Sequence, residues 1–283
     1  MQNEFSNSNK SQSLIIIWVI ISYIMGSSLV HIIASFLNNK YFLTLGTSIS
    51  QFLFLLLPTL LLSKKINLPF KDIFKINLDF KITHLLPAFI GFIGIQLFSG
   101  AFSELQQYIL PSNLREIYVS LQESIRTQYL SIIVLDNIPQ LLLSIFAIAI
   151  TPAICEELFF RGLFQQSLAN SAGQLKAILI SSFVFAIIHL NPVDFVALFI
   201  IGAFLATLVY VSGSIIPAII VHFLNNALAT VILYYEKNTE SDLSSIEPIN
   251  AVIYLLMGAF FTGLAFFILI KNHNLKNISA ESN

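Results

Sequence analysis

The chain has 283 residues, of which 56% are hydrophobic and only 10% are charged, and its formal net charge is −1. A soluble domain carries about 25% charged residues, so this composition excludes a soluble globular protein and indicates a polytopic membrane protein. The near-neutral balance also excludes a broad basic surface, and we expect no nucleic acid partner. The single cysteine, Cys155, excludes an internal disulfide framework and a multi-cysteine metal site.

The chain begins with a polar segment, residues 1–13, which is rich in Asn and Ser and predicts a disordered tail. Apolar segments of the length that a membrane helix needs, about 20 residues, then recur along the chain. They are Leu14–Leu37, Tyr41–Leu62, His84–Phe102, Ile138–Leu168, Leu175–Leu190, Val193–Val211, Ser214–Tyr235 and Ile249–Ile270. The sequence therefore predicts an all-α polytopic integral membrane protein with about eight transmembrane helices.

Two features refine this topology. The fifth segment is short and ends at Asn191-Pro192, which indicates a helix that crosses only part of the bilayer or is buried in protein. The segment Ser103–Tyr129 reads as an amphipathic helix at the external interface.

The orientation follows from the loop after the second predicted helix, where lysines gather. They are Lys64, Lys65, Lys71, Lys75 and Lys81. By the positive-inside rule this loop is cytoplasmic. We therefore predict a multi-pass protein of the cell membrane with both termini in the cytoplasm, and with the acidic stretch Glu236–Glu247 outside.

The fourth predicted helix contains an unusual charged cluster, Glu156-Glu157-Leu158-Phe159-Phe160-Arg161. Each charge at the centre of a membrane helix costs about 2.5–3.5 kcal/mol, so these side chains must be paired, face a cavity or take part in chemistry. Glu157 and Arg161 are four residues apart and can form an ion pair along the helix. Glu156 points about 100° away and is left as a free carboxylate. The alternative interpretation is that the cluster marks a cytoplasmic helix end.

Two later helices carry histidines with partners at helical spacing: Phe185 with His189, and His222 with Asn226. Together with Glu156 they support two kinds of chemistry. Two imidazoles and a carboxylate can hold a divalent metal that keeps one position open for water. Alternatively, Glu156 and His189 can activate a water without a metal, while His222 and Asn226 donate hydrogen bonds to an oxyanion. Either arrangement would hydrolyse an acyl bond, and the H-E-x-x-H signature of zinc proteases is absent.

Three motifs in this order on separate predicted helices resemble the CPBP family, which comprises the CAAX prenyl protease type 2 enzymes and their bacterial Abi or bacteriocin-processing relatives. The motifs are Glu156-Glu157-x-x-x-Arg161, Phe185-x-x-x-His189 and His222-x-x-x-Asn226. The resemblance covers Ile138–Thr230, and it implies an all-helical intramembrane endopeptidase.

The resemblance also implies roles for the residues of the motifs. Glu156 would be the general base, His189 its partner around the catalytic water, and His222 and Asn226 the oxyanion donors. The supporting residues would be Glu157, Arg161 and Phe185. The resemblance leaves open whether zinc or another divalent metal is held by Glu156, His189 and His222, or whether the glutamate works without a metal.

The expected partners are the lipid bilayer and a peptide or membrane-protein substrate. Bacterial relatives are linked to bacteriocin self-immunity, peptide maturation and cleavage of membrane proteins. Two other functions stay open: a non-catalytic self-immunity protein, and a transporter in which Glu156 and the histidines relay protons. The predicted organisation is a tail at 1–13, transmembrane helices and an interfacial segment at 14–137, a catalytic core at 138–235, and a last helix with a polar tail at 236–283.

Overall fold

The computed structural model describes residues 2–37, 39–65, 69–78, 80–134, 136–239 and 246–281, and within these residues every element is a helix. The helices are α1 (Gln2–Leu37), α2 (Lys40–Ser50), η1 (Gln51–Leu56), α3 (Leu57–Ser63), α4 (Phe70–Phe74), η2 (Ile82–His84), α5 (Leu85–Ile109), α6 (Ser112–Ile132), α7 (Ile138–Ile145), η3 (Phe146–Ile150), α8 (Thr151–Glu157), η4 (Leu158–Phe164), α9 (Gln165–Ala172), α10 (Gln174–Ile188), α11 (Phe195–Ser212), α12 (Ile216–Thr239) and α13 (Pro248–Glu281). The elements η1, η3 and η4 are π-helical turns inside longer helices.

The described residues contain 7 helices that are long and apolar enough to cross a membrane, which confirms the polytopic all-α class. They are Leu14–Ala34, Lys40–Ser63, Ile82–Ile109, Ile138–Ala172, Phe195–Ser212, Ile216–Thr239 and Pro248–Asn274. The remaining predicted span, α10, has only 15 residues. The described residues thus contain seven long spans and one short apolar helix, which agrees with about eight predicted segments of which the fifth is short. Pro192 accounts for the early end, because in a continued helix its ring would clash with the carbonyl of Ile188, four residues before it.

Three predicted boundaries also differ from the structure. The segment 1–13, predicted as a disordered tail, is helical from Gln2, because extending an existing helix costs far less than nucleating one. Helix α13 likewise continues to Glu281, through the predicted polar tail. The predicted interfacial helix Ser103–Tyr129 is divided between α5 and α6, since Pro111 cannot continue the hydrogen bonding of α5.

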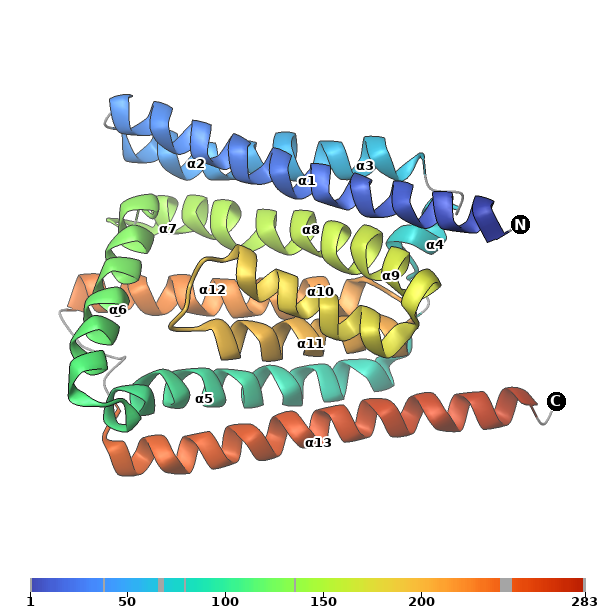
Figure 1. The fold of residues 1–283 in the computed structure, drawn as a ribbon. Coiled ribbons are helices and arrows are strands. Elements are labelled where there is room, and N and C mark those ends of the chain that lie inside the picture. The colour runs from blue at the N-terminus through green and yellow to red at the C-terminus, as the bar shows by residue number, and fades with distance from the viewer. Residues whose placement is uncertain are drawn as a thin grey trace.

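The helices form a bundle with two distinct ends (Figure 1). Helix α6 lies across one end, beside the start of α7 and the ends of α5 and α12, and we name this the α6 end. Helix α4, the turn between α9 and α10, and both chain termini lie at the other end. That end carries Lys64, Lys65, Lys71, Lys75 and Lys81, and we name it the lysine-rich end.

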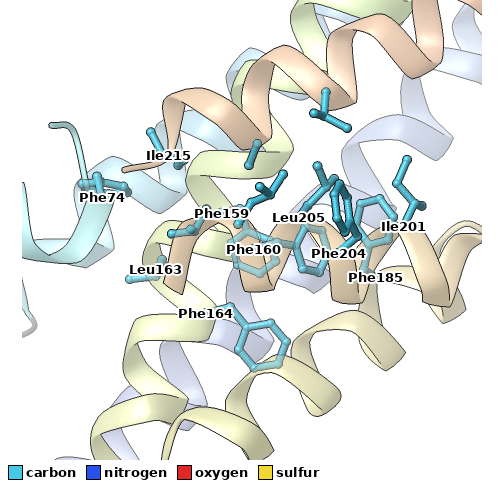
Figure 2. Packing of buried hydrophobic residues seen from close by; sticks show 14 of the residues in the cluster. Phe74, Phe159, Phe160, Leu163, Phe164, Phe185, Ile201, Phe204, Leu205 and Ile215 are labelled. Carbon is cyan, nitrogen blue, oxygen red and sulfur yellow. The ribbon is translucent and has the colours of Figure 1, made fainter. Parts of the chain in front are cut away.

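Buried hydrophobic side chains, many of them aromatic, pack together inside the bundle (Figure 2). The ring of Phe160 meets the ring of Phe185 edge-on with their centroids 5.1 Å apart. Phe74 of α4 is fully buried, and it lies so close to Gly162 that a Cβ at position 162 would come within 2.7 Å of its ring. Lipid tails are as apolar as these rings, so the cluster is held by close van der Waals packing.

Candidate active site

Glu156 lies at the centre of the site, on α8, and its side chain is buried. Three other helices bring polar groups to its carboxylate. Gln51 of η1 donates a hydrogen bond from Nε2 to Oε1 at 3.2 Å. The Nε2 atoms of His189 and His222 lie 4.0 and 3.9 Å from Oε2. These two separations are too long for a direct hydrogen bond. Polar groups at this distance are commonly bridged by a water.

Pro152 explains how the helix around Glu156 is shaped. It has no N–H, so the carbonyl of Ile148, four residues earlier, loses its helical donor. Asn226 of α12 fills this position, because its Nδ2 donates to the Ile148 carbonyl at 3.1 Å. The π-helical turns η3 and η4 flank α8 on both sides, and such turns are frequent at functional sites. Asn226 therefore anchors α12 to the broken helix, one turn along from His222.

Glu157 is connected to the site through its contacts with Arg161 and His222. Its Oε2 pairs with Nε of Arg161 at 3.3 Å, the ion pair expected from their spacing. Its Oε1 lies 2.9 Å from Nδ1 of His222, a contact between helices. Arg161 also donates from Nη2 to the carbonyl of Gly202 at 3.1 Å, and its guanidinium lies 4.7 Å from the centre of the Phe185 ring. Glu157 and Arg161 are 0% and 1% exposed, so this network is fully buried.

His189 is positioned by the end of α10. Its Nδ1 lies 2.7 Å from the carbonyl of Phe185, which can only accept, so Nδ1 carries the proton and donates. In the neutral ring Nε2 is then an acceptor that faces Glu156. The ring of Phe185 packs 4.5 Å from the imidazole, as the i, i+4 spacing predicted. Leu190 follows in a left-handed conformation with φ of 50°, and this turn directs the chain away from the site.

A cavity of about 270 Å³ opens beside Glu156 and His189. Because α10 stops at Ile188, it leaves space between its end and α6. Gln128, Tyr129 and other residues of α6 line the opposite wall. The cavity therefore extends from the carboxylate toward the α6 end of the bundle. An extended stretch of peptide backbone could lie in a space of this kind against Glu156.

Two residues of the site, Gln51 and Tyr23, are absent from the sequence prediction. Tyr23 of α1 lines the same cavity as Glu156. Gln51 donates a hydrogen bond to the carboxylate of Glu156. The available signal was a polar amide in the middle of an apolar span, since such residues in membrane helices face the bundle interior. Both lie outside the region with the three motifs, so only packing brings them to the site.

The turn after His189 is held by Asp194 and Asn191. Asn191 donates from Nδ2 to Oδ2 of Asp194 at 2.8 Å, and the backbone N–H of Asp194 donates to Oδ1 of Asn191 at 3.1 Å. Burial raises the pKa of Asp194 above its ordinary value, and the hydrogen bond from Asn191 opposes this effect. Deprotonation of this carboxyl is thus less favourable in the folded protein than in an exposed aspartate.

The raised pKa of Asp194 predicts a pH-dependent stability. The contribution of this group is fully present below the ordinary pKa of an aspartate, about 3.9, and is lost as the pH rises through the higher pKa of the folded state. The thermal midpoint of the wild type in detergent should therefore fall more steeply across this window than that of Asp194→Asn. Asp72→Asn, at the lysine-rich end, is the control and should keep the wild-type slope. Parallel profiles for all three proteins would contradict the assignment.

The donors around Glu156 are of the type that binds zinc, because two imidazoles and one carboxylate form a known zinc ligand set. Within the described residues no group of three or more His, Cys, Asp or Glu side chains is already close enough to hold an ion. Two ligands with bonds of about 2.0–2.2 Å to a tetrahedral zinc lie about 3.3–3.6 Å apart, and the separations of 3.9 and 4.0 Å exceed this by a few tenths of an ångström.

The fold and the site define a polytopic helical membrane protein with a buried carboxylate near two imidazoles, and the carboxylate and His189 line a cavity. Residues 138–228 match the family model of the Rce1-like proteins, described as type II CAAX prenyl endopeptidase Rce1-like. The match confirms the resemblance to the CPBP family. The matched region includes Glu156, His189, His222 and Asn226. Comparison with the curated proteins and with the solved structures finds no match.

Proposed function

We propose that the protein is an intramembrane endopeptidase that hydrolyses a peptide bond of a membrane-associated protein or peptide, with a water activated by Glu156 and His189. The observation that carries this proposal is the convergence of Glu156 Oε2 with two imidazole Nε2 atoms, 3.9 and 4.0 Å away, beside a cavity. The match to a CAAX endopeptidase domain at residues 138–228 supports the same reaction class.

In the proposed mechanism a water lies between Glu156 and His189. Glu156 Oε2 accepts a proton from this water, and His189 Nε2 accepts its second hydrogen bond. The hydroxyl oxygen attacks the carbonyl carbon of the scissile peptide bond, and the carbonyl oxygen becomes an oxyanion. Glu156 then returns its proton to the departing amine as the carbon–nitrogen bond breaks. One carboxylic acid and one amine are released, and Glu156 is again ionised.

His222 and Asn226 are proposed as the donors that stabilise the oxyanion. Because His222 Nδ1 lies 2.9 Å from Glu157 Oε1, a charged imidazolium would be stabilised by Glu157 and would present Nε2–H to the site. Asn226 uses one N–H on the carbonyl of Ile148 and has a second one to donate. Preorganised donors of this kind contribute about 2.7–4 kcal/mol each to lowering the barrier.

The proposed activity can be tested without a known substrate. Membranes that contain the wild type or Glu156→Gln are incubated, and new protein N-termini are compared by mass spectrometry. Termini that depend on Glu156 identify substrates, which are then assayed with purified enzyme in detergent. Equal sets of termini in both membranes would reject the proposal and favour a non-catalytic role. Adding a chelator and then zinc to the purified enzyme separates the two mechanisms, since only a metal enzyme loses and regains activity.

Gln51 provides a further prediction for the proposed reaction. A hydrogen bond to a charged group contributes about 1.5–3 kcal/mol, so Gln51→Met should lower kcat by about 10-fold or more, with a smaller change in KM. Leu53→Met, which lies two residues along the same helix and is exposed on its outer surface, is the matched control and should retain full activity. An unchanged kcat for Gln51→Met would show that Glu156 does not depend on this contact.

A further inference from the structure

Helix α6 forms one wall of the cavity beside Glu156, and it is only lightly embedded in the bundle. It crosses one end of the bundle (Figure 1), and the only side chain of α6 that is buried is Tyr118. The residues of α6 that line the cavity are Ile125, Gln128, Tyr129 and Ile132. By contrast, almost every residue of α8, which carries Glu156, is buried. Moving α6 therefore costs less packing than moving α8.

Polar contacts tie both ends of α6 to neighbouring helices. Near the start of α6, the hydroxyl of Tyr118 donates to the carbonyl of Ser103 at 2.7 Å, and Nε2 of Gln122 donates to the Ser103 hydroxyl at 3.0 Å. At the end of α6, the hydroxyl of Thr44 on α2 donates to the carbonyl of Ile132. Each hydrogen bond of this kind contributes only modestly to stability, so these contacts hold α6 in place reversibly.

A further contact, the ion pair between Arg126 and Glu236, joins the cavity-lining part of α6 to α12, and we name it the latch. Nη2 of Arg126 lies 2.8 Å from Oε2 of Glu236. The carboxylate is 4% exposed, and its other oxygen, Oε1, is buried without a hydrogen-bond partner among the described residues. A buried charge that loses its partner is destabilised unless it returns to water. Arg126 therefore stabilises Glu236 only while α6 stays in this position.

In this position of α6 the cavity is small for a peptide. Its volume is about 270 Å³, whereas pockets that enclose a small-molecule ligand measure about 300–1,000 Å³. The substrate of an endopeptidase has residues on both sides of the bond that is cut, and that bond must reach Glu156. The cavity must therefore widen to admit such a chain, and α6 is a wall that little packing holds in place.

We propose that α6 is a gate over the candidate site, which moves away from the end of α10 to admit a peptide chain and is held closed by the latch. Joints for this motion are present, because Leu110 before α6 and Ile133 after it have extended backbone conformations. Only the identity of the admitted chain rests on the proposed function. The motion itself does not depend on catalysis, so it can be measured without a substrate.

Cysteine reactivity measures the gate in the full-length protein. Cys155, the single cysteine of the chain, is replaced by alanine, and Ile188→Cys places a thiol in the cavity wall at the end of α10. Protein in lipid nanodiscs is reacted with N-ethylmaleimide, which is small, and with a neutral maleimide on a polyethylene glycol chain, which resembles an extended peptide in shape. The ratio of the long-chain rate to the small-reagent rate reports opening, because differences in thiol reactivity cancel.

Arg126→Met should raise this ratio about 10-fold or more, because it leaves Glu236 uncompensated in the closed position. A hydrogen bond to a charged group biases an equilibrium by a factor of this size. The double variant Arg126→Met/Glu236→Gln should lie closer to the wild type, since no buried charge is then left without a partner. Lys237→Met is the matched control, because it breaks the exposed pair with Asp136 one residue along α12 and should leave the ratio unchanged.

Thr44→Val is a second variant, which leaves all charges in place and decides the test if Arg126→Met does not fold. Valine keeps the shape of the buried threonine but removes the hydroxyl that donates to Ile132, so the ratio should rise about 2–10-fold. Thermal midpoints of all variants are measured beside the wild type. An unchanged ratio in folded Arg126→Met, or an equal rise in Lys237→Met, would overturn the latch, and an unchanged ratio in Thr44→Val as well would overturn the gate.

The outcomes separate the gate from the proposed function. N-termini that depend on Glu156, together with unchanged ratios in Arg126→Met and Thr44→Val, would keep the peptidase and reject the gate. The expected ratios in a protein whose membranes give identical N-termini with and without Glu156 would support the gate and reject the peptidase proposal alone.

Discussion

Glu156→Gln is expected to lower kcat/KM for any identified substrate by about 10²–10⁴-fold, the contribution that a positioned general base makes. Glutamine keeps the size of the side chain and can still accept from Gln51, whose Nε2 lies 3.2 Å from Oε1 in the wild type. It cannot take a proton from the water that we propose beside His189. The measurement is cleavage of the substrate by purified protein in detergent, at equal amounts of folded enzyme.

The matched control for this prediction is Asp72→Asn, which makes the same carboxylate-to-amide change at an exposed site of the lysine-rich end. It should retain wild-type kcat/KM. The thermal midpoints of both variants are measured beside the wild type, so that loss of folding is separated from loss of chemistry. Full activity in Glu156→Gln would contradict the proposed mechanism at its central residue.

The second large effect is expected for stability, from the buried network behind the site. Removing one partner of a buried ion pair costs about 3–5 kcal/mol, because the other charge is left uncompensated. Arg161→Met should destabilise the folded protein by this amount, since Arg161 and Glu157 are 1% and 0% exposed. The double variant Glu157→Gln/Arg161→Met should recover a substantial part of the loss. Unfolding in detergent, followed by intrinsic fluorescence, measures both changes.

The control for the network is the exposed ion pair between Lys237 and Asp136. Exposed pairs contribute little because water and salt screen them, so Lys237→Met should leave the unfolding transition in place. Equal stability of Arg161→Met and the wild type would contradict the structural role of the network. A double variant less stable than Arg161→Met would show that Glu157 is held mainly by His222, to which it is bound at 2.9 Å.

Pro152 illustrates how a single residue connects local sequence to the proposed chemistry. Its missing N–H breaks the ladder of the helix at Ile148, and Asn226 restores the lost donor from another helix. The same asparagine was predicted from its spacing to His222 as an oxyanion donor. In the structure its Nδ2 donates to the carbonyl of Ile148, so Asn226→Ala would remove this contact together with the proposed oxyanion donor and would isolate neither.

The sequence by itself determined the features that depend on spacing along one helix. The apolar segments defined the membrane class because a span of about 20 apolar residues has few other uses. The Glu157–Arg161 pair and the packing of Phe185 on His189 are i, i+4 contacts, which helix geometry fixes without any neighbour. The three motifs also sufficed to indicate the family that the match at residues 138–228 supports.

Only the tertiary structure decided which groups meet between helices. His189 lies at the end of the short helix α10 and His222 near the start of α12, and the sequence does not relate their depths in the membrane. Packing brings both within 4.0 Å of Glu156. Packing also adds Gln51 from a distant helix and joins Glu157 to His222. The cavity exists because α10 stops early while α6 crosses the open end. Spacing along the sequence fixes which face of a helix a residue occupies. It does not fix which other helix packs against that face, and this is why only the tertiary structure shows the partners of Glu156 and the cavity beside it.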